Sequence, residues 1–363
     1  MLDFLNLKPS AFGLDISDFS LKIVKLEKKG KFFGLASFGE KEITPGIIEK
    51  GEIKDEKSLT KIIKEALGEV KGKSLDTQYV IASLPEEKAF LQVIQMPIMR
   101  EEELKKAVRF EAENYVPLSI DKVCLDSQIV PAALDHLDHL DVLITALPKK
   151  TVDPYVGCLK KAGLKPLALE MESQAIYRAL IDGGMTLKPV LLIDLGASRT
   201  GFSIFSGYSL RFTSSVPVSS RKFTQAIAND LKIDFQKAEE LKINEGIGGN
   251  KEGRKNHKAL EPLLMELVGE IEKHIEYYQT HSTHDHLPSG DKKIEKIILC
   301  GGGANLKGLS DFLSIELKLP VERGNPWTNI LPDPLREVPQ LPYEESLRYT
   351  TALGLAQRGL NHD

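Results

Sequence analysis

The 363-residue sequence predicts an α/β protein in which two similar domains face one another across a central cleft. Two stretches support this prediction: "FGLDISDFSLKIVKLEKKGK", which contains Asp15, and "LIDLGASRTGFSIFS", which contains Asp194. In each stretch an apolar run ends in the aspartate and continues through a small, hydroxyl-rich turn into a second strand-like run. Because they lie about half the chain apart, we interpret them as corresponding parts of duplicated domains.

The first unit reads as a meander of strands followed by a helix and a further strand. Apolar residues at three- and four-residue spacing predict an amphipathic helix over Lys57–Val70, with Asp55 or Ser58 as its N-cap. "QYVIASLP" is then expected to be a short buried strand. The strands of the meander are expected at Ala11–Asp15, Ser20–Lys28 and Phe32–Glu42.

Residues 86–149 read as a small α+β insertion. A strand at Lys88–Met96 precedes a helix over Glu101–Asn114, which Pro117 stops. Two further strands, "VCLDSQIVP" and "LDVLITALP", are joined by the polar "AALDHLDHLD", which we expect to be a surface connection. A helix at "TVDPYVGCLKKAGL" and a strand entering a helix at "KPLALEMESQAIYRAL" then return to the first domain.

The second aspartate stretch opens another meander, which is followed by helices. Helices are expected over Ser219–Leu231, over Phe235–Asn244 with Asp234 as N-cap, and over Glu261–Thr280. The segments around the third helix, "GIGGNKEGRKNH" and "HSTHDHLPSGDKK", read as loops. "KIEKIILCGGGANLKGLSDFLSIEL" is a strand, a glycine turn and a helix, and "YEESLRYTTALGLAQRGL" is a closing helix.

These elements predict four structural parts. The first domain comprises residues 1–85, 150–184 and 342–363, and the insertion comprises residues 86–149. The second unit comprises residues 185–225 and 294–341, with a helical subdomain at 226–293.

The composition is that of an ordinary globular protein, with 42% apolar and 28% charged residues. The formal net charge of −4 gives no reason to expect a nucleic-acid partner, since a surface that follows the phosphate backbone needs a strongly basic patch. Cys124, Cys158 and Cys300 have no paired spacing and lie in or beside apolar runs, so we expect reduced, buried thiols in a cytoplasmic protein. The histidines around His281, His284 and His286 read as solvated loop residues rather than metal ligands.

The sequence predicts no membrane segment of its own. No apolar stretch approaches the roughly 20 residues that span a bilayer, and "MLDFLNLKPSAFG" does not resemble a secretory signal. The ending "LAQRGLNHD" is too short and polar for a membrane-binding amphipathic helix. If the protein works at a membrane, we expect a partner to hold it there.

The two aspartate turns have the chemistry of a phosphate site. Backbone N–H groups in such turns can hold phosphate oxygens, and a strand-end aspartate can hold a hydrated Mg²⁺. Either turn alone is also a common structural feature, but the duplication favours a site. The candidates are Ser17, Ser20 and Lys22 in the first turn, Gly196, Ala197, Ser198 and Thr200 in the second, and Asp15 and Asp194 for the metal.

Two other stretches are candidates for the rest of a nucleotide site. Gly301, Gly302 and Gly303 would let a backbone pack flat against a planar ring, or they simply form a tight strand-to-helix turn. Glu239 and Lys242 share one helix face and could bind ribose hydroxyls, or they form an ordinary ion pair.

Taken together, these motifs resemble the actin-like ATPase superfamily, whose fold has two duplicated RNase H-like domains around a nucleotide cleft. More narrowly, the chain resembles the PilM family of type IV pilus assembly, in the FtsA/PilM branch. The resemblance runs from about residue 10 to 361 and rests on "GLDISDFSLKIVKL", "RFEAENYVPLSID", "LLIDLGASRTGFSIF", "AEELKI" and "TTALGLAQRGL". The α+β insertion at 86–149 also favours this branch over sugar kinases.

The resemblance implies that ATP and Mg²⁺ bind at the candidates named above. It also implies a groove that binds the N-terminal cytoplasmic peptide of a PilN-like inner-membrane protein, which would hold the chain at the cytoplasmic face of the inner membrane. The resemblance also implies self-association, and it offers pilus assembly ATPases as further candidate partners. Such a protein is at most a slow ATPase.

The first turn departs from the family pattern, because Ser17, Asp18 and Phe19 replace a glycine and serines. Asp18 would repel a triphosphate unless it points away or helps to hold the metal. Arg199 in the second turn could reach a phosphate, or it faces solvent. Glu170 and Glu172 are candidates for orienting a water molecule at the γ-phosphate, or they serve a domain contact or a helix cap.

Two other functions stay open on the sequence. An FtsA-like division scaffold has the same fold, although the C-terminal amphipathic helix is not seen. A small-molecule kinase would need a carboxylate base beside an acceptor pocket, and no such residue can be singled out.

Overall fold

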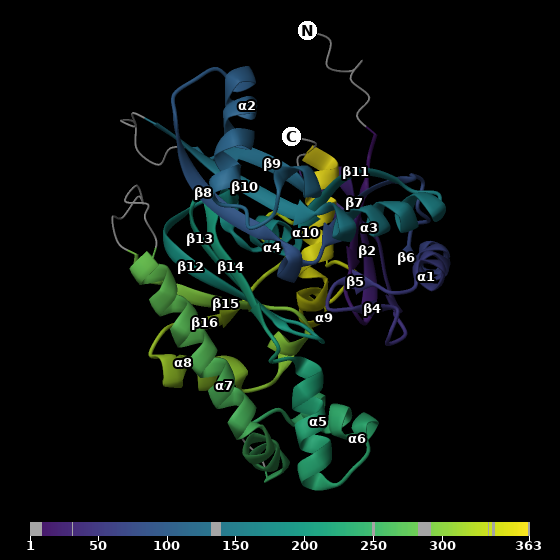
Figure 1. Ribbon diagram of the computed structural model, residues 1–363. Coiled ribbons are helices and arrows are strands. Elements are labelled where there is room, and N and C mark those ends of the chain that lie inside the picture. The colour runs from purple at the N-terminus through teal and green to yellow at the C-terminus, as the bar shows by residue number, and fades with distance from the viewer. Residues whose placement is uncertain are drawn as a thin grey trace.

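The computed structural model describes residues 9–30, 32–131, 139–248, 251–281, 292–332, 334–335 and 338–361. These residues form a six-stranded sheet, a five-stranded sheet, a three-stranded sheet and a two-stranded hairpin (Figure 1). Helices pack on the large sheets. The predicted α/β class is therefore confirmed.

The six-stranded sheet has the strand order β11-β7-β1-β2-β3-β6. The predicted meander is present, since β1 pairs antiparallel with β2 and β2 with β3, while β1 pairs parallel with β7 and β7 with β11. The strands are β1 (Phe12–Ile16), β2 (Ser20–Lys29), β3 (Phe32–Glu42), β6 (Lys71–Gly72), β7 (Tyr79–Leu84) and β11 (Lys165–Met171), and the separate hairpin is β4 (Ile48–Glu49) with β5 (Glu52–Ile53).

Alternate residues of β1 face opposite sides of this sheet, as a strand requires. Phe12 and Leu14 lie in one buried cluster with α1 (Glu56–Gly68) and α3 (Lys149–Lys161). The other face packs on α4 (Glu172–Leu180) and α10 (Thr350–Asn361). Gly13 allows α10 to come this close, because a Cβ at that position would lie 2.6 Å from Ala356 N.

The five-stranded sheet repeats the plan of the first, with the order β14-β13-β12-β15-β16. Here β12 pairs antiparallel with β13 and parallel with β15, as β1 does with β2 and β7. Asp15 and Asp194 therefore occupy equivalent places near the carboxyl ends of β1 and β12. The strands are β12 (Thr186–Leu195), β13 (Thr200–Gly207), β14 (Ser209–Val216), β15 (Lys296–Cys300) and β16 (Val321–Arg323).

Helices α5 (Ser220–Leu231), α6 (Phe235–Glu245), α7 (Lys251–His281) and α8 (Leu309–Leu317) follow the strands of this half. Part of this group extends away from both sheets (Figure 1). The predicted N-caps are confirmed where a side chain accepts from the first turn: Asp234 accepts from Lys237 N, and Asp55 accepts from Lys57 N and Ser58 N on α1.

Residues 90–148 contain a sheet of their own, with the antiparallel order β8-β10-β9. Helix α2 (Glu101–Glu111) packs on it through Leu104 and Val108. We call this part the inserted sheet. Its strands are β8 (Phe90–Pro97), β9 (Val123–Ile129) and β10 (His139–Pro148). Most of the predicted surface connection lies in 132–138, outside the described residues.

Two sequence-based predictions are wrong. The segment before the longest helix is not all loop, since α7 already begins at Lys251. Its first turns are polar and lack an apolar period, but Asn256 Nδ2 donates to Gly246 O (2.9 Å) and to Leu241 O (3.2 Å), which fixes this end of the helix. Cys124 is exposed rather than buried, because it lies on the outward face of the edge strand β9, whereas Cys158 and Cys300 are buried as expected.

The closing helix is divided in the structure, with α9 (Tyr343–Ser346) and a short 3₁₀ turn preceding α10. The loop that follows α7 lies largely in 282–291, outside the described residues, and so do His284 and His286. Among the described helices, none has the length and apolar character needed to cross a membrane.

Candidate functional site

The turn between β1 and β2, residues 17–19, is the first of the two predicted turns. Ser17 N and Ser17 Oγ both donate to Ser20 O at 2.9 Å, which closes the hairpin. Lys22 pairs in register with Asp15 and donates from Nζ to Ser20 Oγ (2.7 Å). The structure thus brings the four predicted residues of this turn together.

Asp18 and Phe19 point in two different directions from the first turn. Asp18 Oδ1 accepts a hydrogen bond from Gly51 N (3.0 Å), so this carboxylate is held by the turn between β4 and β5. The Phe19 ring lies 4.6 Å from the guanidinium carbon of Arg221 on α5, and Phe235 lies 4.9 Å from the same carbon. Arg221 therefore connects the first turn with the helices of the second half through cation–π contacts.

The turn between β12 and β13, residues 196–199, is the second predicted turn. Gly196 N donates to Arg199 O (2.9 Å), and Ser220 N at the start of α5 donates to Gly196 O (3.0 Å). Thr200 is fully buried, and its hydroxyl donates to Val218 O (2.8 Å), so it supports the turn from within. Ala197 is exposed and Ser198 partly exposed, which leaves this stretch of backbone accessible.

Asp15, Asp194 and Glu172 of α4 interact electrostatically, and we call them the acidic cluster. Burial and then the Asp15 carboxylate raise the pKa of Asp194 to about 6. Burial, followed by repulsion from Asp15 and Asp194, also raises the pKa of Glu172 well above its usual range. Lys22 lies among these groups; burial lowers its pKa, and Asp15 opposes that shift.

The cluster fits a cation that is held through water. Burial is the largest cause of the raised pKa values of Asp194 and Glu172, and repulsion among the carboxylates adds to it; a divalent cation would relieve this repulsion. Within the part of the chain that the structure describes, no three His, Cys, Asp or Glu side chains are grouped closely enough to hold a metal ion directly. Hydrated Mg²⁺ is the ion that most often binds with few direct protein ligands.

The structure separates the two candidate carboxylates, Glu170 and Glu172. Glu170 accepts from Arg178 Nη1 (2.6 Å) and Arg358 Nη1 (2.5 Å), so it joins α4 to α10 in a buried ion cluster. All three residues belong to the predicted first domain, so Glu170 has a structural role within that domain rather than in a contact between domains. Glu172 instead belongs to the acidic cluster, with its Oε1 3.5 Å from Arg199 Nη2.

Lys242 and Glu239 form an ion pair (2.7 Å) that also binds α5. Lys242 Nζ donates to Ser220 Oγ (2.8 Å) and Thr224 Oγ1 (2.7 Å), and the Lys242 side chain is only 7% exposed. The pair therefore fixes the start of α5 beside the second turn. A ribose hydroxyl would have to share or replace these contacts.

The three glycines after β15 differ in what they allow. A Cβ at Gly301 would collide with Asp194 Oδ1, and a Cβ at Gly303 would lie 2.5 Å from Leu195 Cγ. The packing of the turn against β12 therefore requires glycine at both positions. This agrees with the interpretation of the glycines as a tight strand-to-helix turn. Gly302 would meet only Arg348 Cβ, at 3.7 Å, so its surroundings leave room for a ligand.

A family model described as type IV pilus assembly protein PilM matches residues 13–360. The chain belongs to the type IV pilus assembly protein PilM family. A solved chain of a PilM–PilN type IV pilus biogenesis complex is similar over 97% of this chain and 99% of that one, with a TM-score of 0.78 and 28% identity. The resemblance of the sequence to the PilM family is thereby confirmed.

More distant proteins share the fold alone. The ethanolamine utilization protein EutJ of Carboxydothermus hydrogenoformans is 15% identical, with a TM-score of 0.56 over 96% of this chain and 89% of that one. MreB5 of Spiroplasma citri, solved with ADP, is 12% identical, with a TM-score of 0.56 over 97% of this chain and 96% of that one. These similarities confirm the predicted actin-like ATPase fold.

The cell division protein FtsA is a more distant relative in sequence. The FtsA of Pseudomonas aeruginosa is 23% identical over 229 residues, which cover 56% of this chain and 50% of that protein. The FtsA of Neisseria meningitidis is 24% identical over 188 residues, covering 47% and 44%. The chain thus spans about half the length of the curated relatives it matches.

Several residues of this PilM family member that contact the predicted site were not expected from the sequence. Ser83 Oγ donates to Asp15 Oδ1 (3.0 Å) and accepts from Ile16 N (2.9 Å). Ser83 lies near the end of β7, and a hydroxyl side chain near the end of this predicted buried strand is the signal that could have found it. Glu87, which pairs with Arg199, and Arg221 carry no such local signal.

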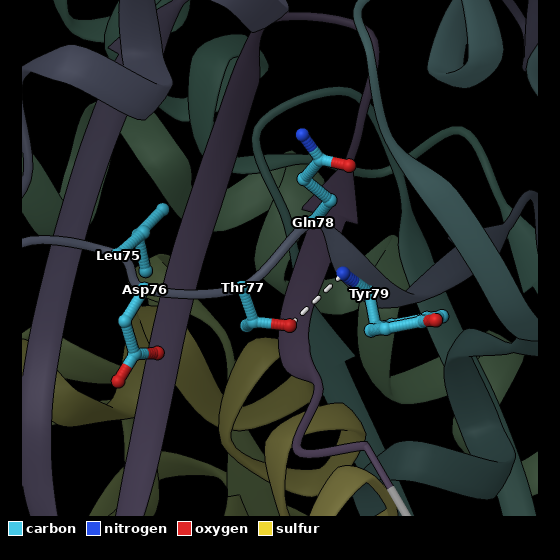
Figure 2. Close-up of a pocket in the computed structure, with 5 residues that line it drawn as sticks. All are labelled: Leu75, Asp76, Thr77, Gln78 and Tyr79. Atoms are coloured by element: carbon cyan, nitrogen blue, oxygen red, sulfur yellow. Dashed lines mark hydrogen bonds between the residues drawn. The ribbon is translucent and has the colours of Figure 1, made fainter.

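Two surface hollows are lined by residues of the first part of the chain. One, of about 500 Å³, is lined by Leu75–Tyr79 where the chain enters β7, at the opposite end of the strand from Ser83; Thr77 Oγ1 accepts from Tyr79 N there (Figure 2). The other, of about 490 Å³, adjoins the first turn through Asp18 and Phe19 and is lined by Lys50, Lys54 and Lys88 among others. Neither has the acidic cluster in its lining.

Proposed function

We propose that this PilM family member is an assembly protein that binds ATP with Mg²⁺ between its two turns and binds the N-terminal cytoplasmic peptide of a PilN-like inner-membrane protein. The observation that carries the nucleotide part is the acidic cluster around Lys22, with Asp15 near the end of β1, Asp194 near the end of β12 and Glu172 on α4. Similarity to the solved PilM–PilN complex over nearly the whole of both chains supports the peptide part.

The proposed nucleotide site uses the two turns in complementary ways. Asp15 and Asp194 would hold a hydrated Mg²⁺, which supplies the positive charge that a polyphosphate needs in this acidic surrounding. Lys22 and the backbone N–H groups of residues 197–199 would bind phosphate oxygens, while Gly196 closes the turn. The proposed site is completed by Ser17, Ser20, Gly302 and the pair Glu239–Lys242. Gly301 and Gly303 fix the shape of the turn after β15.

Glu172, rather than Glu170, is the proposed catalytic candidate. It is in the acidic cluster, whereas both oxygens of Glu170 accept from arginines. A carboxylate beside the phosphates can orient water for their hydrolysis. The proposal is therefore slow hydrolysis at most, not phosphate transfer to a small molecule.

We also propose that residues 86–149 form the inserted subdomain and that the remaining boundaries follow the sequence prediction. The separate inserted sheet supports this division. The protein would be held at the cytoplasmic face of the inner membrane by its PilN-like partner. Self-association and contact with pilus assembly ATPases stay predictions.

Two titrations test the proposal. Calorimetry with MgATP should show binding that EDTA abolishes or strongly weakens. A synthetic peptide from the N-terminus of the PilN-like protein should raise the melting temperature in proportion to its occupancy, and a scrambled peptide should not. Absence of MgATP binding would refute the nucleotide part, and absence of a peptide-specific shift would refute the partner part. Rapid, acceptor-dependent turnover of roughly 1–100 per second would indicate a kinase instead.

A further inference from the structure

Arg199 of the second turn pairs with two carboxylates that belong to the other half of the molecule. Its guanidinium forms an ion pair with Glu87, and its Nη2 lies 3.5 Å from Glu172 Oε1. Glu87 belongs to the short 3₁₀ helix Glu86–Lys88, which follows β7 and leads into β8 of the inserted sheet. The side chains of Arg199 and Glu87 are only 15% and 17% exposed, so this contact is largely removed from water.

The position of Glu87 does not depend on Arg199 alone. Glu86 Oε2 accepts from Ser173 N at the start of α4 (3.1 Å), and Lys88 Nζ lies 3.2 Å from Glu52 Oε1 of β5. The backbone is thus held on both sides of Glu87, and a change of this one side chain should leave the segment folded.

Gly51 provides the space that the Glu87 carboxylate occupies. A Cβ at Gly51 would lie 3.2 Å from Glu87 Oε1 and 2.5 Å from Pro85 Cβ. Gly51 also has a φ of +71°, which favours glycine. The carboxylate therefore lies in a site that the surrounding backbone is shaped to accept.

The charges around Arg199 would allow a phosphate to replace the Glu87 carboxylate as its partner. Burial lowers the pKa of the guanidinium, and Asp18, Glu86 and Asp15 oppose this shift, so acidic groups surround it on several sides. Arginine binds carboxylate and phosphate through the same planar fork of N–H donors. A phosphate held by the backbone of residues 197–199 would lie on the same turn as Arg199 and would compete with Glu87 for it.

We propose that Glu87 is an internal competitor for the phosphate groups of the bound ligand: Arg199 exchanges Glu87 for a phosphate oxygen when a polyphosphate occupies the second turn. This inference rests on the proposed function. Because Glu87 lies three positions before Phe90, where β8 begins, the exchange releases a contact at the base of the inserted sheet. Binding of a polyphosphate at the second turn is thereby coupled to the loss of the Arg199–Glu87 contact in the segment that leads into the inserted sheet.

The test compares Glu87→Gln with a matched control, Glu49→Gln, which removes an exposed carboxylate of β4 from the same neighbourhood. Calorimetry measures the binding of MgATP and of inorganic tripolyphosphate with Mg²⁺ to the full chain. Glu87→Gln should tighten the binding of both ligands about tenfold, which corresponds to about 1.4 kcal/mol, and Glu49→Gln should leave the binding of both unchanged. In an Arg199→Gln background, the gain from Glu87→Gln should disappear, since the exchange needs the arginine.

The outcomes separate this inference from the proposed function. A gain that persists in the Arg199→Gln background would show general electrostatic relief and overturn the inference, as would no gain at all. If tripolyphosphate binds with the Arg199-dependent gain while MgATP does not bind, the ATP proposal fails and the inference stands. If neither ligand binds any variant, both fail.

Discussion

Ser83 and Asp15 are joined by a 3.0 Å hydrogen bond between two parallel strands, β7 and β1, although 68 positions separate them in the chain. The same Ser83 hydroxyl oxygen accepts from Ile16 N (2.9 Å), so it satisfies one backbone donor and orients one carboxylate. Ser83 is fully buried. It is therefore a positioning residue for the first turn.

Replacement of Ser83 by alanine should lower both stability and nucleotide affinity. A hydrogen bond to a charged group contributes about 1.5–3 kcal/mol, and the Ile16 N–H would remain buried without this partner. We expect a loss of that size in the free energy of unfolding, measured in urea, and weaker MgATP binding in the same samples. Ser74→Ala, at an exposed position, is the matched control and should change neither; equal effects of the two substitutions would contradict the role of Ser83.

The raised pKa of Asp194 predicts a pH dependence of stability. An unfolded aspartate titrates near its usual value, below the value of about 6 in the folded chain, so the folded state binds more protons between these two values. Asp194 should therefore destabilise the fold increasingly as the pH rises from about 4 to about 6, by at most about 3 kcal/mol, and lowering the pH through this window should relieve it.

Urea titrations of the wild type and of Asp194→Asn at pH 4, 5, 6 and 7 test this dependence. Asp194→Asn should be more stable than the wild type at pH 7, and the difference should vanish near pH 4. Asp126→Asn, at an exposed position on β9, provides the control for a surface carboxylate. A stability difference between wild type and Asp194→Asn that does not change with pH would contradict the assignment.

The parts of this fold that follow from neighbouring residues could be predicted from the sequence. The two strand–aspartate–turn units depend on local alternation and turn chemistry, and the N-caps Asp55 and Asp234 depend on residues two and three positions away. The start of α7 was missed because its first turns carry no apolar period and are fixed by Asn256 from within the fold.

The contacts that complete the candidate site arise from tertiary structure instead. Arg199 meets Glu87 and Phe19 meets Arg221 only because two halves of the chain come together, and nothing near either residue in sequence signals its partner. Glu170 and Glu172 are two positions apart and looked equivalent, yet the strand-to-helix junction directs one to α10 and the other to the acidic cluster.

Glu170→Gln and Glu172→Gln should have opposite effects. Loss of the Glu170 charge leaves Arg178 and Arg358 without their shared carboxylate, which should cost about 3–5 kcal/mol of stability. Loss of the Glu172 charge removes repulsion from Asp15 and Asp194, so stability should be retained or increased. Any slow release of phosphate from ATP should fall in Glu172→Gln. Equal unfolding midpoints for the two variants would contradict this separation.

Phe19→Ser should loosen the contact between the first turn and α5. The cation–π contact with Arg221 contributes about 0.5–1 kcal/mol at a partly exposed site, and the serine offers no ring. We expect a stability loss of that order and faster dissociation of a fluorescent ATP analogue in stopped-flow measurements. Phe110→Ser, at a position 74% exposed on α2, is the control; if it speeds dissociation as much as Phe19→Ser does, the Phe19–Arg221 contact has no role in retaining nucleotide.

The central claim is that two turns from duplicated halves hold one magnesium–nucleotide complex. A double-mutant cycle of Asp15→Asn and Asp194→Asn, with the dissociation constant for MgATP measured by calorimetry, tests it most directly. Because both carboxylates would act on the same cation, the double variant should lose less than the sum of the single losses, with a coupling of at least about 1 kcal/mol. Additive losses, or a wild-type chain that does not bind MgATP, would contradict the claim.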